Sequence, residues 1–207
     1  MENRQGHLYI ISAPSGAGKT SLIKALLKGV DGLQVSVSHT TRKRRPNEVE
    51  GEDYHYVSID QFREMLAEGD FLEYAEVFGN HYGTSKTAVE ELIEKGVDVI
   101  LELDWQGARQ IQQKMPKAIR IFVLPPSLEA LNQRLTNRAQ DDEAVITNRM
   151  LQAKQEMSHF NEYQFVIIND VFEEAYQELK ALVISERLRL ERQMFEHRGL
   201  INSLLND

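Results

Sequence analysis

The chain carries the run Ala13-Pro14-Ser15-Gly16-Ala17-Gly18-Lys19-Thr20 between an apolar segment, residues 8–11, and a helical pattern of apolar residues that begins at Leu22. A strand, a glycine-rich loop, Lys-Thr and a helix in that order are typical of a phosphate-binding P-loop. Small residues let successive backbone N–H groups face phosphate oxygens, and the helix adds its positive N-terminal end. The run therefore predicts a nucleoside triphosphate site, with Lys19 at the β- and γ-phosphates and Thr20 as a ligand of Mg²⁺.

Length and composition describe a globular protein. The 207 residues suffice for one large α/β domain with a substantial core. The longest apolar runs, such as residues 121–124, are too short to span a bilayer, and residues 1–6 lack the pattern of a signal peptide. The chain has no cysteine, which excludes disulfides and thiolate metal sites. We therefore expect a cytoplasmic protein that does not bind membranes.

The distribution of charge indicates a small anionic ligand. The formal net charge of −8 argues against general nucleic-acid binding, because such binding depends on broad neutralisation of phosphates. Positive charge is instead gathered in the run Arg42-Lys43-Arg44-Arg45 and at Arg134, Arg138 and Arg149. Local cationic clusters on an acidic chain favour a small, highly charged ligand over a polymer, so no nucleic-acid partner is expected.

Strands and helices alternate along most of the chain, which predicts an α/β fold with a parallel, doubly wound sheet. The segment of residues 38–95 has a more broken, β-rich rhythm, and we expect it to form a small insertion against the P-loop core. Helical patterns follow residues 20, 58, 85, 104, 127 and 143, and a long amphipathic helix is predicted from 172 to 190. Strands are predicted at residues 8–11, 33–38, 54–57, 71–77, 97–104, 119–124 and 165–168.

An acidic residue, Asp104, ends the buried strand predicted at 97–104. Apolar residues followed by an acid fit the Walker B pattern, in which the carboxylate lies at the end of a parallel strand near the metal and the phosphates. The pattern is weak alone, because buried strands often end in Asp, and it gains weight beside a P-loop. The chain lacks the Asn-Lys-x-Asp motif that reads guanine in switch GTPases, and we interpret Trp105 as a packing residue.

Residues 36–54, SVSHTTRKRRPNEVEGEDY, closely resemble the GMP-binding signature of guanylate kinases. They contain Thr-Thr-Arg, a second Arg three residues later, and then Glu, Gly and Tyr at matching offsets. Three further blocks are similar, at residues 71–75, 79–84 and 103–107, and the likeness continues through the three distal arginines to residues 168–170. It covers essentially the whole chain, so the protein resembles a guanylate kinase of the bacterial type.

This resemblance implies a P-loop nucleoside monophosphate kinase fold. Its core would be formed by residues 1–37, 96–126 and 156–207, with a small mixed α/β GMP-binding subdomain at 38–95 and a helical lid at 127–155. The resemblance also implies phosphoryl transfer from Mg-ATP to GMP, which gives ADP and GDP in purine nucleotide metabolism. Both ATP and GMP would be small-molecule partners of the chain.

The resemblance assigns roles to matching positions of this sequence. The phosphate of GMP would be bound by Arg42, Arg45, Tyr54 and Tyr82. The guanine base would be bound by Ser38, Glu73, Thr84 and Asp104, with Glu102 in a nearby acidic position. Catalysis would use Lys19, Arg42 and the lid arginines Arg134, Arg138 and Arg149, and Asn169 would lie near the adenine of ATP.

These residue types suit that chemistry. Guanine offers N–H donors that Glu73 and Asp104 can accept, whereas adenine would set an acceptor against a buried carboxylate, and such mismatches discriminate strongly. Planar arginine forks match a phosphate dianion. The acceptor phosphate is already ionised near neutral pH, so no catalytic base is required. Catalysis then depends on positioning and charge neutralisation.

Two other functions stay open at this point: a guanylate-kinase-like module that binds phosphorylated peptides, and a P-loop kinase with another acceptor. The presence of Lys19 and Thr20 disfavours the binding module, which typically lacks an intact P-loop. Departures from the family pattern at Ala13, Arg44 and Asn47 leave the local loop shapes open. The C-terminal helix is a candidate either for packing within the chain or for joining a homodimer.

Overall fold

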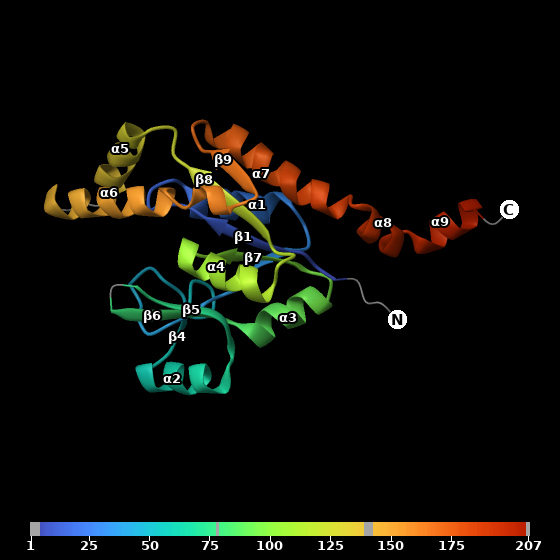
Figure 1. Cartoon of the computed structure of the whole chain (residues 1–207), viewed down its shortest axis with the longest axis horizontal. Coiled ribbons are helices and arrows are strands. Elements are labelled where there is room, and N and C mark those ends of the chain that lie inside the picture. The colour runs from blue at the N-terminus through green and yellow to red at the C-terminus, as the bar shows by residue number, and fades with distance from the viewer. Residues whose placement is uncertain (1–4, 78, 139–142, 206–207) are drawn as a thin grey trace.

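The computed structural model describes residues 5–77, 79–138 and 143–205 (Figure 1). Its centre is a five-stranded sheet in which every neighbouring pair of strands is parallel, which confirms the predicted fold class. Parallel strands that are covered on both faces consist of nearly continuous apolar residues, and the strand quoted first from the sequence is buried throughout. The strand order is β2 (Leu33–Val35), β7 (Asp98–Glu102), β1 (Leu8–Ser12), β8 (Ile119–Leu124) and β9 (Phe165–Ile168).

Helices cover both faces of this sheet. On one face, α1 (Lys19–Gly29) and α7 (Phe172–Arg187) pack on the strands in one apolar core. On the other face, α3 (Lys86–Glu94) and α4 (Trp105–Lys114) form a second core. Alternate residues of β1 enter the two cores, as the period of two of a strand requires. The P-loop and the carboxyl ends of the strands therefore rest on a rigid, doubly covered sheet.

A smaller four-stranded sheet lies below the core (Figure 1). Its strand β6 (Asn80–Ser85) has few strand-forming residues and was not predicted, but it pairs antiparallel with β5 along its whole length. The predicted start of α2 (Ile59–Glu68) is confirmed by a capping box between Ser58 and Gln61. The strand order is β4 (His55–Tyr56), β3 (His39–Thr40), β6 and β5 (Phe71–Val77).

The small sheet is fastened to the core through α4. The Gln110 side chain accepts a hydrogen bond from the Tyr74 N–H (3.2 Å) and donates one to the Tyr74 carbonyl (2.8 Å). The Lys114 ammonium donates to the Leu72 carbonyl at 2.6 Å. Because α4 begins directly after β7, these contacts hold β5 close to the carboxyl end of a central strand.

Two helices, α5 (Leu128–Arg138) and α6 (Glu143–Met157), pack against each other at the edge of the molecule beyond β8 (Figure 1). A short 3-10 turn, η1 (Phe160–Glu162), then leads into β9. No helix in the described part of the chain is long and apolar enough to cross a membrane.

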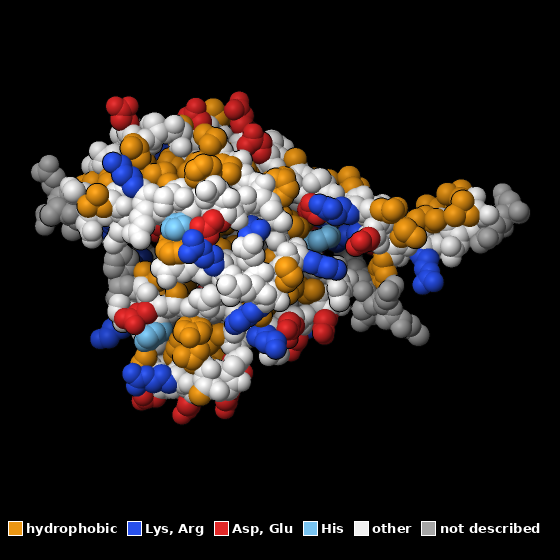
Figure 2. Space-filling model, in the orientation of Figure 1, with side chains coloured by type: hydrophobic (Ala, Val, Ile, Leu, Met, Phe, Trp, Pro, Cys, Tyr) orange, Lys and Arg blue, Asp and Glu red, His pale blue; other side chains and the backbone are white. Residues whose placement is uncertain are grey.

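The prediction of a single helix at 172–190 is wrong at its C-terminal end, because the helix stops earlier. The structure ends α7 at Arg187 and continues with α8 (Leu190–Glu196) and α9 (Arg198–Leu205), which project from the core (Figure 1). Arg189 has extended dihedrals (φ −59°, ψ 142°), which break the helix. Apolar side chains are exposed along the projecting helices (Figure 2).

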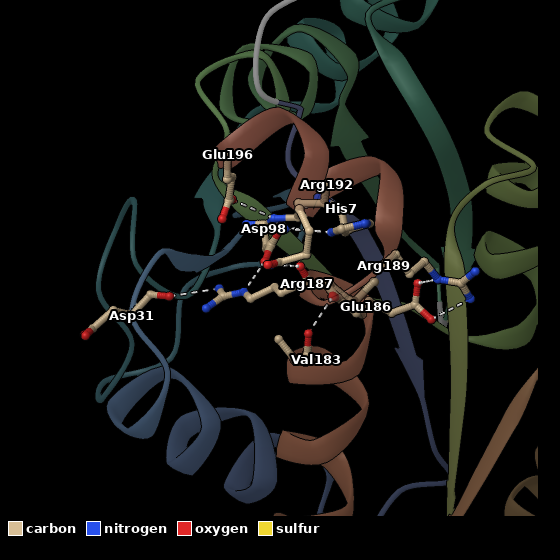
Figure 3. A network of polar contacts seen from close by, with 11 residues as sticks. His7, Asp31, Asp98, Val183, Glu186, Arg187, Arg189, Arg192 and Glu196 are labelled. Atoms are coloured by element: carbon tan, nitrogen blue, oxygen red, sulfur yellow. Dashed lines mark hydrogen bonds and ion pairs between the residues drawn. The ribbon is translucent and has the colours of Figure 1, made fainter. Parts of the chain in front are cut away.

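A buried carboxylate holds this break in place (Figure 3). Asp98, at the start of β7, is fully buried and accepts hydrogen bonds from the His7 N–H (2.8 Å), Arg187 Nε (2.7 Å) and Arg192 Nη1 (2.8 Å). Burial alone would raise the pKa of Asp98, but these hydrogen bonds outweigh it and hold the pKa well below its usual range. The ion pairs tie β7, the chain before β1 and the C-terminal helices into one unit.

Candidate active site

The P-loop connects β1 to α1 in a conformation that only glycine adopts easily. Gly16 (φ 88°) and Gly18 (φ 95°) are both left-handed, and Gly18 is the N-cap of α1. The first N–H groups of a helix have no partner within it, and Gly18 offers no side chain to accept from them. The start of α1 is therefore suited to an anion, as the sequence predicted.

The P-loop is held from both sides. The Asn169 side chain, which follows β9, donates from Nδ2 to the Ala17 carbonyl at 2.7 Å. A Cβ at Gly18 would lie 2.3 Å from that same Nδ2, and one at Gly16 would lie 3.1 Å from the Leu131 side chain of α5. Asn169 is buried and supports the loop, a role that the sequence did not reveal, while its contact with adenine stays a prediction.

The residues at the start of α1 fit a magnesium ion. Thr20 Oγ1 donates to Glu102 Oε2 at 3.3 Å, which places a hydroxyl and a carboxylate side by side. Mg²⁺ prefers oxygen ligands of this kind and usually completes its shell with substrate phosphates and water. Within the described residues no group of three or more His, Cys, Asp or Glu could hold a metal alone. Thr20 and Glu102 therefore fit an ion that arrives with the nucleotide.

This arrangement corrects the Walker B interpretation of Asp104. The structure ends β7 at Glu102, and the acid that meets Thr20 is Glu102. Asp104 is the N-cap of α4, and its Oδ1 accepts from the Gly107 N–H at 2.8 Å. The role of Asp104 beside the base stays a prediction, and Glu102, not Asp104, lies beside Thr20, the predicted ligand of magnesium.

Three of the residues predicted to bind guanine form one hydrogen-bonded chain. Glu73 and Thr84 face each other across β5 and β6, and Thr84 Oγ1 donates to Glu73 Oε1 at 2.6 Å. Thr84 Oγ1 also lies 3.4 Å from Ser38 Oγ. A Cβ at Gly107 would lie 2.9 Å from Glu73 Oε2, so α4 approaches the carboxyl group closely at a position that the sequence did not single out.

The environment of Glu73 is unusual for a carboxyl group. Its side chain is only 4% exposed, and burial raises the pKa of Glu73 to about 7. The hydrogen bond from Thr84 opposes this rise in the pKa, and the negative charge of Asp104 adds to it. Two neighbouring carboxyl groups, one buried and one half-buried, suit a ligand that brings N–H donors.

A second group of predicted residues forms around Arg42. Its Nη2 donates to Glu48 Oε1 at 2.7 Å, and its guanidinium lies 5.3 Å from the centre of the Tyr54 ring. Tyr54 in turn lies edge-on to Tyr82, with 5.8 Å between ring centres. The hydrogen bond from Arg42 lowers the pKa of Glu48 to about 2. The Arg45 side chain is 72% exposed, with 4.0 Å between its Nη1 and Glu48 Oε1.

Glu48 is therefore an organising residue of the cationic loop. It accepts from Arg42, from the Arg45 N–H (2.9 Å) and from the Tyr56 hydroxyl (2.7 Å). The sequence showed Glu48 only as one position of the GMP-binding signature, without a role. The structure shows that it orients the arginine that is predicted to bind phosphate.

The three arginines of the predicted lid differ in their hydrogen bonds and burial. Arg134 of α5 donates from Nη2 to the Asn169 carbonyl (3.0 Å), while its buried Nη1 has no partner among the described residues. A buried, unpaired guanidinium nitrogen beside the P-loop support suits an incoming anion. Arg149 is half-buried on α6. The side chain of Arg138, at the end of α5, lies outside the described residues.

Comparisons with known proteins agree with this geometry. The family model described as guanylate kinase matches residues 5–186. The guanylate kinase of Escherichia coli K12 is 57% identical over 205 residues, which span 98% of this chain and 99% of that protein. That of Vibrio parahaemolyticus is 54% identical over 203 residues, with 97% and 98% covered.

A solved structure shows the same likeness in three dimensions. The crystal structure of guanylate kinase from Anaplasma phagocytophilum matches with a TM-score of 0.75 and 33% identity, over 91% of this chain and 90% of that one. The chain belongs to the guanylate kinase family.

Proposed function

We propose that the protein transfers the γ-phosphoryl group of Mg-ATP to GMP, which gives ADP and GDP. The observation that carries this proposal is the hydrogen-bonded chain of Ser38, Thr84 and Glu73 beside Asp104, in which Thr84 and Glu73 are buried. Its carboxyl groups accept hydrogen bonds, and guanine presents N1–H and N2–H₂ donors. Adenine presents an acceptor at N1 and would leave a buried charge unpaired. The family membership supports the same acceptor.

Different parts of the chain hold the phosphates of the donor, ATP, and of the acceptor, GMP. The P-loop N–H groups and Lys19 bind the phosphates of ATP, and Arg42 with Tyr54 and Tyr82 binds the phosphate of GMP. Thr20 and Glu102 would hold a magnesium ion, which would supply positive charge to the phosphates of ATP. The Nη1 of Arg134, which has no partner among the described residues, is available to the transferring group. These groups position the two nucleotides and neutralise the charge on their phosphates, and no general base is needed.

We also propose the functional partition that the sequence suggested. Residues 1–37, 96–126 and 156–207 form the core, residues 38–95 bind GMP, and residues 127–155 form a lid. Closure of such parts excludes water from the transferring phosphoryl group and so prevents wasteful hydrolysis of ATP. Cytoplasmic location and self-association remain sequence predictions.

The test is the formation of ADP from Mg-ATP with GMP, AMP, CMP, UMP or dTMP offered separately. We expect rapid turnover with GMP alone, and a loss of at least about 10²-fold in Lys19→Ala. Turnover with another acceptor would retain the kinase but overturn the assignment of Glu73 and Asp104. A folded protein that is inactive with every acceptor would favour the binding module.

A further inference from the structure

The strand that carries Glu73 departs from regular geometry directly before this residue. In the ladder with β6, Phe71 and Glu73 pair with the adjacent residues Ser85 and Thr84. Leu72 is thus an extra residue, a β-bulge, which changes the direction of the side chains next to it. Regular alternation would turn one residue in two away from the core, yet residues 71–73 are all buried. The bulge therefore decides where the Glu73 carboxyl group points.

Side chains of α4 hold the backbone on both sides of Glu73. In the described small sheet β5 is an edge strand, so the outer side of its backbone has no neighbouring strand to pair with. The Lys114 ammonium donates to the Leu72 carbonyl at 2.6 Å. The Gln110 side chain accepts from the Tyr74 N–H at 3.2 Å and donates to the Tyr74 carbonyl at 2.8 Å, as a residue of a paired strand would. The residues before and after Glu73 are thus tied to one helix.

The same helix also bears parts of the predicted guanine site. Its N-cap is Asp104, and a Cβ at Gly107 would lie 2.9 Å from Glu73 Oε2. Gly107, Gln110 and Lys114 are spaced by three and four residues, so they share one face of α4. One helix face therefore leaves room for the Glu73 carboxyl group and holds the strand on which it stands.

We propose that Gln110 and Lys114 are positioning residues of the guanine site: they hold the bulge of β5 to α4 and so fix the direction of the Glu73 carboxyl group. Asp104 begins the same helix, so the spacing between the two carboxyl groups follows from these contacts. The inference rests on the proposed binding of guanine by Glu73. The hydrogen bonds of Gln110 and Lys114 go to the backbone of β5, so both residues act on the base through Glu73.

The first test is Gln110→Leu, which removes both hydrogen bonds to Tyr74 without changing any charge. Tyr74 is 45% exposed, so water can replace these bonds and the fold should survive. A displaced carboxyl group weakens binding of the base in the ground and transition states alike, so the KM for GMP should rise about tenfold with kcat nearly unchanged. Affinity for AMPPNP should stay the same, and Gln113→Leu, at an exposed position of α4, should change neither value. An unchanged KM for GMP, or an equal loss of AMPPNP affinity, would overturn the role of Gln110.

Lys114 is tested by substitutions that remove or keep its donor. Lys114→Met should raise the KM for GMP in the same way, whereas Lys114→Arg keeps a charged donor and should recover most of the loss. The control is Lys117→Met, which removes one positive charge at an exposed position just beyond α4 and should leave the KM unchanged. Equal KM values for Lys114→Met and Lys114→Arg, or an unchanged KM in Lys114→Met, would overturn the role of Lys114.

A double-mutant cycle separates positioning from general support of the fold. If Gln110 acts through Glu73, Gln110→Leu should lower kcat/KM for GMP about tenfold alone, but less than about twofold when Glu73→Gln is already present. This ratio can be measured even where GMP does not saturate the enzyme. Equal factors in the two backgrounds would overturn the inference. An unchanged kcat/KM in Glu73→Gln itself would instead reject the proposed guanine site, so the two failures are distinguishable.

Discussion

Replacing Glu73 by Gln should make the protein more stable and less able to bind GMP. Glu73 is 4% exposed, and burial raises its pKa from 4.5 in the reference state to about 7. A carboxyl group whose pKa is higher in the folded state contributes stability below pH 4.5 and loses it as the pH rises through 7. At about 1.4 kcal/mol per pKa unit, the difference corresponds to about 3 kcal/mol of lost stability when the group is ionised.

The variant Glu73→Gln removes this cost because the amide carries no charge. Its Oε1 can still accept the hydrogen bond that Thr84 donates at 2.6 Å, so the local network survives. The free energy of unfolding should therefore exceed that of the unaltered protein by about 3 kcal/mol near pH 8. The gain should shrink to under about 1 kcal/mol near pH 5, where the carboxyl group of the folded protein is already protonated.

Urea unfolding without nucleotide at the two pH values measures this difference. Glu76→Gln is the control, because it removes the same charge from an exposed position on the same strand. A gain that is absent near pH 8, or equal at both pH values, would refute the reasoning. Calorimetry should show that Glu73→Gln loses affinity for GMP far more than for AMPPNP, and unchanged GMP affinity would reject its role in reading the base.

Three other substitutions test separate parts of the structure. Asp98→Asn leaves the arginines of the C-terminal helices without their buried carboxylate and should cost about 3–5 kcal/mol in urea unfolding; an unchanged midpoint would contradict this. Gly107→Ala places a Cβ 2.9 Å from Glu73 Oε2 and should weaken GMP but not AMPPNP in calorimetry, whereas equal loss of both ligands would contradict it. Glu48→Gln loosens Arg42 and should raise the KM for GMP about tenfold with a smaller change in kcat. The reverse pattern in steady-state kinetics would show that Glu48 acts on the chemical step.

The central sheet was predictable because its strands are buried on both faces. Strands such as β1 and β8 are continuous apolar runs bounded by turn residues, so each can be recognised locally. The break after Arg187 could not be predicted in the same way. It coincides with ion pairs to Asp98, which lies 89 residues earlier in the chain. Strand β6 likewise depends on pairing with β5 rather than on its own residue types.

The candidate site was predictable where its chemistry depends on a short motif. The P-loop was found from its own motif, whereas Ser38, Thr84 and Glu73, which the structure joins by hydrogen bonds, were implied by the resemblance to guanylate kinases. The choice between Glu102 and Asp104 could not be made from sequence, since both acids stand at one strand end. In the fold, Asp104 caps α4, while Glu102 accepts a hydrogen bond from Thr20 and is therefore the better candidate for the place beside magnesium.

Two buried acids in this protein show how a buried carboxyl group without a hydrogen-bonded cation marks the predicted guanine site. Asp98 is fully buried, yet its pKa is lowered, because His7, Arg187 and Arg192 are hydrogen-bonded to it. Glu73 is buried to a similar degree, yet its pKa is raised, and Lys114 donates to a backbone carbonyl of β5 instead of to it. A carboxyl group that the fold leaves uncompensated costs stability, and such a cost is retained where a ligand supplies the missing donors. The donors of guanine would do so for Glu73, which is why the same substitution should raise stability and abolish recognition.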